Sequence, residues 1–189
     1  MSIPAIILAA GASRRLGTPK QALLWEGEAL LHRTARVALE AGFAPVLVVL
    51  GAAAEASLEA LAGLNVEVVP NPEWEEGMGA SIRAGMAAVP DGTEAVLLLV
   101  CDQPALSQNL LNEIRRVHDQ APGRVVASTY AGTRGVPALF PRQRFPELRA
   151  LSGDRGARGL LLGEDILEVP FPGGEQDVDT PADREFQSK

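Results

Sequence analysis

Residues 3–20 read IPAIILAAGASRRLGTPK, and the rest of the fold prediction builds outward from this stretch. Residues 3–9 are an apolar run with one proline, which is typical of a strand buried on both faces of a parallel sheet. The run ends at Gly11, and two arginines and a lysine follow. Backbone N–H groups in such a turn can bind an anion, and the nearby cations add positive charge. The stretch therefore predicts a buried strand that leads into a phosphate-binding loop; a tight turn with solvated arginines is the alternative.

Short apolar runs recur along the first half of the chain, and segments with helical periodicity separate them. The strand-like runs are residues 45–50, 66–69 and 95–100. The helical segments are residues 29–41, 53–62, 78–89 and 107–120, with Ser107 as the predicted N-cap of the last. This alternation predicts βαβ units with right-handed crossovers and a parallel sheet.

The second half of the chain is less regular. It predicts strands at residues 125–128, 136–140 and 166–169 and a short helix at residues 155–162. Glycine and proline between these pieces indicate loops and a mixed sheet edge. We therefore predict an α/β fold, with one domain over residues 1–189, built as a three-layer αβα sandwich around a mostly parallel, Rossmann-like sheet. Ligands bind such sheets beyond the carboxyl ends of the strands, near the point where strand order reverses, so Gly11 and Asp102 mark the expected site.

Composition and charge restrict the possible partners. The formal net charge is −7, which disfavours duplex nucleic acid because an acidic chain repels the phosphate backbone. A single cysteine, Cys101, excludes an intrachain disulfide and fits a reducing compartment. The N-terminal charges follow the apolar run, the reverse of a signal peptide, and no apolar stretch is long enough for a membrane span. We expect a soluble, cytoplasmic protein with neither a nucleic-acid nor a membrane partner.

The motif LAAG-x-S-x-R-x-G-x-x-K in residues 8–20 resembles the signature loop of the molybdenum cofactor nucleotidyltransferase family, a branch of the NTP-transferase superfamily. The resemblance implies a sheet of the nucleotide-diphospho-sugar transferase type. It also implies catalytic roles for Arg15 and Lys20, which would hold the triphosphate. The nucleotide contacts that it implies in this loop are Leu8, Ala9, Ala10, Gly11, Ser13, Arg15 and Lys20.

Residues 71–85, NPEWEEGMGASIRAG, resemble the family segment N-x-x-W-x-x-G-M-x-x-S. A helix that opens near Gly79 would present free N–H groups to an anion or a base edge. The resemblance implies nucleotide contacts by Asn71, Gly79 and Ser81. The alternative is a simple helix cap with Trp74 in the core.

Two acidic motifs predict a metal site. Asp102 directly follows the buried run in LLLVCDQP, and a carboxylate there is costly unless it has a partner such as Mg²⁺, which prefers oxygen ligands. In the family this aspartate holds the metal, and an N-cap is the alternative. The segment DVDTPAD, residues 177–183, resembles the family's D-x-D-T-P-x-D and implies that Asp179 is the second ligand. A helix start capped by Thr180 would also explain that segment.

Two motifs of the second half resemble the acceptor side of the family site. RGVPALF, residues 134–140, implies contacts by Gly135 and Pro137. SGDRGARGLL, residues 152–161, implies contacts by Asp154 and Arg158, although a helix cap also explains Asp154. Many molybdopterin cytidylyltransferases carry histidine between the glycine and the proline, where this chain has Val136, so the sequence leaves the acceptor open.

The predicted function is Mg²⁺-dependent transfer of CMP from CTP to molybdopterin, with release of pyrophosphate. CTP is preferred because the guanylyltransferase branch has glycine where this chain has Ala10, and an extra methyl group would narrow the base pocket. Another phosphorylated acceptor, or GTP, is an alternative. A non-catalytic carrier or insertion chaperone is another, and a transient contact with a molybdoenzyme is a possible partner interaction. His32 and His118 are interpreted as structural or solvated.

Overall fold

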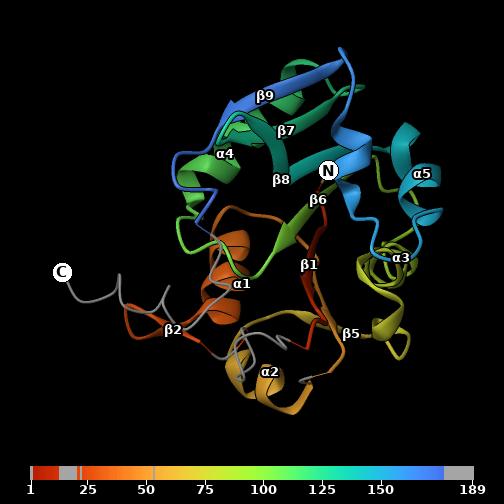
Figure 1. Cartoon of the computed structure of the whole chain (residues 1–189). Helices are drawn as coiled ribbons and strands as arrows, with labels where there is room; N and C mark the ends of the chain where they lie inside the picture. Colours follow the sequence, from red (N-terminus) through yellow and green to blue (C-terminus); the bar gives the residue numbers. More distant parts are fainter. Residues whose placement is uncertain (1, 13–20, 22, 53, 177–189) are drawn as a thin grey trace.

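A seven-stranded sheet forms the centre of the computed structural model, which describes residues 2–12, 21, 23–52 and 54–176. The strand order is β5-β4-β1-β6-β8-β7-β9, and only β8 runs against its neighbours within this part of the chain (Figure 1). The strands are β1 (Ala5–Ala9), β4 (Val46–Leu50), β5 (Glu67–Pro70), β6 (Ala95–Val100), β7 (Val125–Tyr130), β8 (Thr133–Pro141) and β9 (Ile166–Pro170). The predicted mostly parallel sheet with a mixed edge is confirmed.

Helices cover both faces of the sheet (Figure 1). One layer contains α1 (Leu30–Glu40) and α4 (Gln108–Gln120), and the opposite layer contains α3 (Met78–Ala87) and α5 (Phe145–Arg149). The remaining helical segments are α2 (Ala54–Ala60), η2 (Trp74–Glu76), η3 (Arg142–Arg144) and η4 (Ala157–Leu161). The three-layer α/β architecture predicted from the alternation of apolar runs and helical segments is therefore confirmed.

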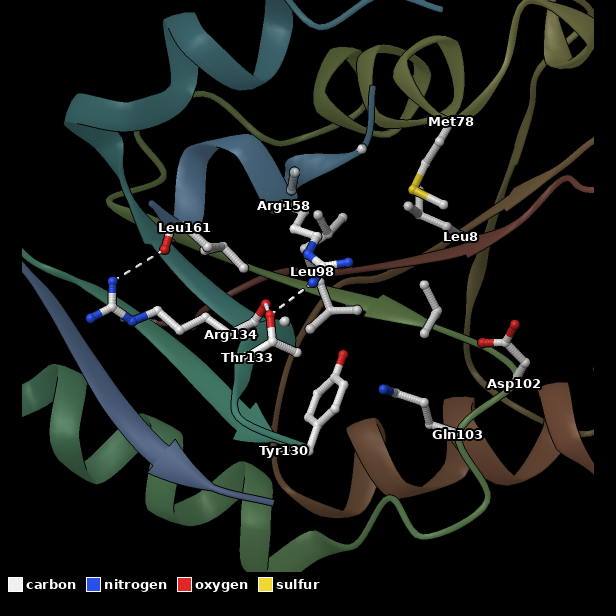
Figure 2. A pocket seen from close by; sticks show the side chains of 15 residues that line it. Leu8, Met78, Leu98, Asp102, Gln103, Tyr130, Thr133, Arg134, Arg158 and Leu161 are labelled. Carbon is white, nitrogen blue, oxygen red and sulfur yellow. Dashed lines mark hydrogen bonds between the residues drawn. The ribbon is translucent and has the colours of Figure 1, made fainter. Parts of the chain in front are cut away.

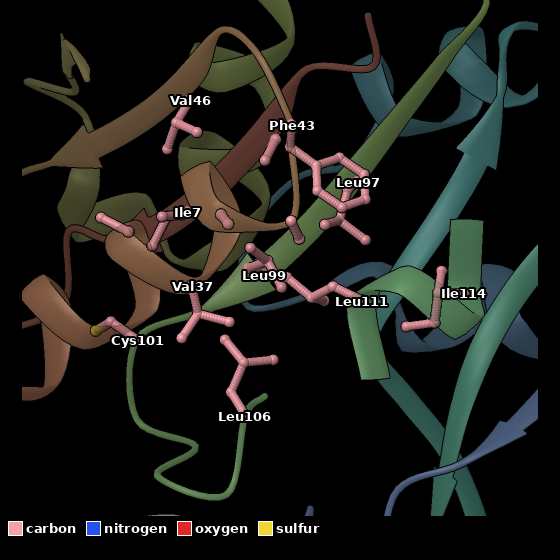
Figure 3. Packing of buried hydrophobic residues seen from close by; sticks show 14 of the residues in the cluster. Ile7, Val37, Phe43, Val46, Leu97, Leu99, Cys101, Leu106, Leu111 and Ile114 are labelled. Carbon is pink, nitrogen blue, oxygen red and sulfur yellow. The ribbon is translucent and has the colours of Figure 1, made fainter. Parts of the chain in front are cut away.

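Alternation along β1 divides the core between the two layers. Ile7 packs in one cluster with α1 and α4, and Ile6 packs in the other with α3. Figure 3 shows the first cluster, in which Val37 of α1 and Leu111 of α4 meet side chains of the sheet. Because successive side chains of a strand point to opposite faces, a run that is apolar throughout buries both of them. The uninterrupted run at residues 3–9 is explained by this arrangement.

A glycine brings α3 close to the sheet. A Cβ atom on Gly85 would lie 2.6 Å from Cγ2 of Ile6 and 3.2 Å from Cγ2 of Val49. Both of these side chains are buried and β-branched, so they have little freedom to move away. The close approach fixes the height of α3 above β1 and β4, and α3 carries the segment that contacts the candidate site.

Several elements were not predicted from the sequence. A short hairpin joins β2 (Leu24–Trp25) to β3 (Glu28–Ala29), with positive φ angles at Glu26 and Gly27 in its turn. The helix expected at residues 155–162 is the shorter 3₁₀ segment η4, and α5 was not expected at all. By contrast, Ser107 caps α4 as predicted, because its side-chain oxygen accepts a hydrogen bond from the Leu110 N–H at 3.3 Å.

The strand order reverses between β1 and β6. After β1 the chain moves to β4 and β5 on one side, and the later strands lie on the other side, beginning with β6. In an open α/β sheet this is where ligands bind, beyond the carboxyl ends of the strands. Gly11 and Asp102 follow these two strand ends, as expected. Within the described residues, no helix combines the length and apolar character needed to cross a bilayer.

Candidate active site

A cavity of about 330 Å³ lies at the carboxyl ends of β1 and β6 (Figure 2). Four side chains or backbone positions predicted from four separate motifs line it together: Leu8, Asp102, Gly135 and Arg158. Leu8 and Val100 are register partners on adjacent strands, so β1 and β6 present their ends to the same space. The structure therefore brings the nucleotide, metal and acceptor motifs to one place, although their roles remain predictions.

Asp102 stands in the loop directly after β6 and is half-buried at the cavity wall. Its neighbour Gln103 also lines the cavity, and the Gln103 Nε2 donates to the Gly174 carbonyl at 3.0 Å. The turn after β9 is thereby held beside the end of β6. Asp179, the predicted second metal ligand, lies outside the described residues. In the part of the chain that the structure describes, no cluster of three or more His, Cys, Asp or Glu side chains could hold a metal by itself.

The predicted phosphate-binding loop is only partly described. Ser13, Arg15 and Lys20 lie outside the described residues. Gln21 follows them, is only 2% exposed, and its Nε2 donates to the carbonyl oxygens of Ala9 at 2.7 Å and Gly11 at 3.0 Å. The chain that leaves the end of β1 is thus tied back to the same strand end. Sequence reasoning missed Gln21, because a lone glutamine next to a motif gives no periodic pattern.

At the start of the loop, two buried alanines are followed by a glycine that has open space beside its Cα atom in the described part of the chain. Ala9 and Ala10 are buried, and the Ala10 carbonyl accepts a hydrogen bond from the Ala52 N–H at 3.2 Å. Among the described residues, a Cβ atom on Gly11 would meet nothing within 4 Å. Packing against these residues therefore does not require glycine at that position, whereas close approach of a ligand to the backbone would.

Asn71 and Ser81 make a buried hydrogen bond to each other. The Asn71 Nδ2 donates to the Ser81 Oγ at 3.1 Å, and the Asn71 Oδ1 accepts from the Glu73 N–H at 3.1 Å. Both side chains are buried, and together they join the end of β5 to α3. The structure thus gives both residues a structural role, and their contact with a nucleotide stays a prediction.

The glycine segment before α3 docks onto the loop at residues 152–154. The Gly79 N–H donates to the Gly153 carbonyl at 2.9 Å, and a Cβ atom on Gly79 would lie 2.7 Å from the Ser152 backbone. Gly77 has a φ of 108° and would collide with the same loop if it carried a side chain. Two motifs about 75 residues apart in the sequence therefore fit against each other. This backbone amide of Gly79 is occupied by the protein, so a role for Gly79 in nucleotide binding stays a prediction.

Two of the residues predicted to contact the acceptor, Asp154 and Pro137, do not line the cavity. Asp154 is exposed beside Gly77, lies outside the cavity lining, and makes no cap to the 3₁₀ segment that follows. Pro137 is buried beyond the cavity, and its carbonyl accepts from the Ser128 Oγ at 2.8 Å. Val136, where the resemblance leads us to expect histidine, does line the cavity.

Two arginines reach the cavity with different electrostatic surroundings. The Arg134 Nε lies 2.6 Å from the Glu168 Oε1, and its Nη1 donates to the carbonyl oxygens of Leu161 and Gly163. The Arg158 Nη2 donates to the Thr133 Oγ1 at 2.9 Å, and none of the described carboxylates pairs with Arg158. Within the described residues, the positive charge of Arg158 is therefore not neutralised by a carboxylate, and its contact with an acceptor stays a prediction.

Sequence reasoning missed several lining residues. Met78, Tyr130, Thr133 and Arg134 contribute to the cavity, and Gln103 lies beside Asp102. Met78 packs over Gly156, where a Cβ atom would lie 2.6 Å from the methionine sulfur. Thr133 and Arg134 directly precede the glycine–proline motif at residues 135–137, so their position next to that motif was the available indication.

Comparison with known proteins identifies a family. The model of the MobA-like NTP transferase domain matches residues 5–167. Nicotine blue oxidoreductase of Paenarthrobacter nicotinovorans is 34% identical over 194 residues, covering 94% of this chain and 92% of that protein. Purine catabolism protein PucB of Bacillus subtilis (strain 168) is 34% identical over 191 residues, covering 93% and 91%. Molybdenum cofactor cytidylyltransferase of Escherichia coli (strain K12) is 27% identical over 185 residues, covering 96% and 93%.

Solved structures extend the similarity to the whole fold. Rv0371c of Mycobacterium tuberculosis H37Rv is 34% identical, with a TM-score of 0.82 and full coverage of both chains. A structure of the same protein in complex with manganese is 30% identical, with a TM-score of 0.81 and coverage of 99% of this chain and 98% of that one. The likeness therefore extends over all the elements that line the cavity.

Proposed function

The chain belongs to the family of MobA-like NTP transferase domains, and from that premise we propose that it transfers CMP from CTP to the phosphate group of molybdopterin. The family makes it a nucleotidyltransferase, and the choice of CTP and of molybdopterin is our proposal. One observation supports it above all: Leu8, Asp102, Gly135 and Arg158, from four motifs, line a single cavity at the switch point of the sheet. Both substrates of a nucleotidyl transfer must meet at one place, and this is the place that the fold offers.

The chemistry requires alignment more than proton transfer. An oxygen of the acceptor phosphate attacks the α-phosphorus of CTP, and the bond from that phosphorus to the bridging oxygen of the β-phosphate breaks, releasing pyrophosphate. A phosphate monoester is largely dianionic at neutral pH, since its second pKa is about 6, so it needs no general base. No histidine is among the described residues that line the cavity. Positive charge and orientation are then the main requirements of catalysis.

The oxygen donors of the site fit a divalent cation. Mg²⁺ is commonly bound by one or two carboxylates plus substrate phosphates, and it keeps several waters. Asp102 supplies one carboxylate at the cavity wall, and Asp179 is proposed as the second. When bound there, Mg²⁺ would neutralise charge on the phosphates during transfer. A manganese complex of a protein 30% identical to this chain supports a divalent metal in the family.

The proposal assigns the remaining residues to binding. Lys20 and Arg15 would hold the triphosphate, and Gln21 would keep their loop against the end of β1 through its bonds to Ala9 and Gly11. Arg158 would contact the acceptor. We place the reaction in the cytoplasm, where the single cysteine of the sequence, Cys101, would stay reduced, with a molybdoenzyme as the recipient of the product.

The choice of nucleotide depends on Ala10. This residue is buried just after β1 in the α3 layer of the core, and the proposal is that its methyl group leaves less room for the base of the nucleotide. The relatives do not decide between CTP and GTP, because enzymes of both types are about equally similar to this chain. Molybdenum cofactor guanylyltransferase of Rhodobacter capsulatus is 29% identical, and molybdenum cofactor cytidylyltransferase of Escherichia coli is 27% identical. Faster pyrophosphate release with GTP than with CTP would contradict the proposed preference.

One relative favours a second candidate. The protein of Paenarthrobacter nicotinovorans that is 34% identical to this chain is named an oxidoreductase. A cavity that accepts a nucleotide beside a ring system could also accept a reduced nicotinamide dinucleotide, which would pass a hydride to a two-electron acceptor. That activity would oxidise the nicotinamide and would release no pyrophosphate from CTP.

A pyrophosphate-release assay with CTP, Mg²⁺ and molybdopterin tests the proposal. Asp102→Asn and Lys20→Ala should each lower the rate by about two orders of magnitude or more, as loss of an electrostatic stabiliser does. Asp119→Asn, on the exposed face of α4, is the matched control and should be unchanged. Normal turnover in the Asp102 variant would contradict the proposal, and binding of nucleotide with no turnover in the wild-type protein would indicate a carrier.

A further inference from the structure

Tyr130 projects into the acceptor half of the cavity, although no sequence motif singled it out. It is the last residue of β7 and the only tyrosine in the sequence. Figure 2 shows its hydroxyl pointing into the space between Thr133 and Gln103, below the guanidinium of Arg158. A phenol combines a flat apolar ring with one hydrogen-bonding group, so its placement at a cavity wall calls for an explanation.

Two glycines and an aromatic ring hold Tyr130 in place. A Cβ atom on Gly135 would lie 2.6 Å from the phenol Cζ and would overlap the hydroxyl oxygen, and one on Gly174 would lie 2.6 Å from Cδ1. The Phe171 ring meets the phenol edge-on, with 5.8 Å between the ring centroids and an interplanar angle of 89°. Gly135 is not among the glycines with positive φ, so its backbone conformation does not require glycine, but the space taken by the phenol does. The ring is therefore fixed before any ligand binds.

The surroundings of the hydroxyl suit an anionic group attached to a ring system. Arg158 has no carboxylate partner among the described residues, so the cavity carries a positive charge close to the phenol. Leu8, Leu98 and Met78 form an apolar wall of the same cavity. Charge-assisted hydrogen bonds to a phosphate are strong, and preorganised donors make them stronger.

We propose that Tyr130 determines acceptor specificity: its O–H donates a hydrogen bond to the acceptor phosphate, alongside the Arg158 guanidinium. The Val136 side chain is apolar and supplies no hydrogen-bond donor of its own. Gly135, in turn, is a positioning residue that acts through Tyr130 by leaving room for its ring, and it need not contact the substrate at all. This inference rests on the proposed function, because it takes the acceptor to be a phosphate monoester.

Tyr130→Phe tests the hydroxyl, since it removes one oxygen and keeps the ring between its neighbours. The KM for molybdopterin should rise about tenfold or more, as expected for a hydrogen bond to a charged group. The KM for CTP should stay unchanged. An unchanged KM for molybdopterin, or an equal rise in both KM values, would overturn the proposal.

Gly135→Ala tests the positioning role. The added methyl group should displace the phenol, raise the KM for molybdopterin as Tyr130→Phe does, and lower the unfolding midpoint. In the Tyr130→Ala background, where the ring is already gone, Gly135→Ala should cost little further stability and change acceptor affinity little further. Additive losses of stability in that double variant would show that the two residues do not share the same space, contrary to the proposal.

A direct binding measurement separates this inference from the proposed function. The single tyrosine allows uniform 3-fluorotyrosine labelling with one ¹⁹F resonance, which should shift on titration with molybdopterin and shift less with inorganic phosphate. If the wild-type protein releases no pyrophosphate but the resonance shifts, the proposed function fails and the acceptor contact stands. If it releases pyrophosphate and the resonance does not move, the function stands and the contact at Tyr130 is refuted.

Discussion

The two arginines of the cavity show how neighbouring residues of one type take different roles. Arg134 joins β8 to η4 and β9, because its guanidinium pairs with Glu168 at 2.6 Å and donates to two backbone carbonyls. Arg158 donates to the Thr133 hydroxyl and keeps its charge for a ligand. The sequence around the two arginines does not distinguish these roles, whereas the groups that each guanidinium contacts in the structure do.

Substitution of each arginine by glutamine should give opposite results. Arg158→Gln should raise the KM for the acceptor by about ten- to a hundredfold, as for loss of a hydrogen bond to a charged group, and leave stability unchanged. Arg134→Gln should lower the free energy of unfolding by about 1–3 kcal/mol, since it leaves Glu168 and two carbonyls without their donor. Steady-state kinetics and urea unfolding measure the two effects. An acceptor defect confined to the Arg134 variant would contradict this division.

At the scale of elements, a charged cluster joins the β2–β3 hairpin to α1. The two carboxylate oxygens of Glu28 accept from Arg36 at 2.8 Å each, and Oε1 also lies 2.8 Å from the His32 Nδ1. The hydrogen bonds from Arg36 lower the pKa of Glu28 to about 2. This cluster fixes where the hairpin, which follows the predicted phosphate-binding loop in the chain, meets the first helix.

This cluster predicts a pH dependence of stability. A carboxyl whose pKa is lowered in the folded state stabilises the protein fully above its unfolded pKa of about 4.5, and this stabilisation is lost as the pH falls toward 2. Glu28→Gln should therefore lower the free energy of unfolding near pH 6 by about 1 kcal/mol, since water screens a partly exposed pair, and by much less near pH 2.5. Urea unfolding at the two pH values measures the difference.

The control for this prediction is Glu113→Gln, which removes a similar contact to Arg116 on the exposed surface of α4. Solvent screens that pair more strongly, so its effect at both pH values should be smaller. If Glu28→Gln lowers the free energy of unfolding equally at pH 6 and pH 2.5, packing of the side chain, and not its charge, holds the hairpin to α1.

For the molecule as a whole, the site is assembled from both halves of the chain around the switch point of one sheet. β1 and β6 supply its centre, and the β7–β8 pair with η4 supplies the side that we propose binds the acceptor. A ligand that contacts so many elements binds the folded chain and not the unfolded one. Binding should therefore stabilise the whole fold through mass action.

Thermal unfolding measures that linkage. CTP with Mg²⁺ at about a hundred times its Kd should stabilise the protein by about 2.7 kcal/mol, and GTP at the same concentration should stabilise it less. Chelation of the metal, or the Asp102→Asn substitution, should remove most of the shift. A midpoint that rises equally with and without metal would argue against a carboxylate-bound cation in nucleotide binding.

Local patterns in the sequence were sufficient for the elements and for part of the site. The run of residues 95–100 predicted β6 with the bounds observed, and the cap at Ser107 was found where expected. The β2–β3 hairpin escaped prediction because strands of two residues are too short to show alternation. The position of Asp102 at the cavity wall was predictable because it follows a buried run, whereas its role and those of Arg15, Lys20 and Asp179 remain predictions.

The sequence by itself determined that this is an α/β protein with a candidate phosphate-binding loop and an aspartate at the tip of a buried strand. Apolar runs, caps and glycine-rich turns act over a few residues, so they can be read along the chain. Only the tertiary structure decided that β8 lies between β6 and β7, that Gly79 docks onto residues 152–154, and that the space beside Gly135 belongs to Tyr130. Those contacts depend on strand order and on packing between distant segments, which no local pattern encodes.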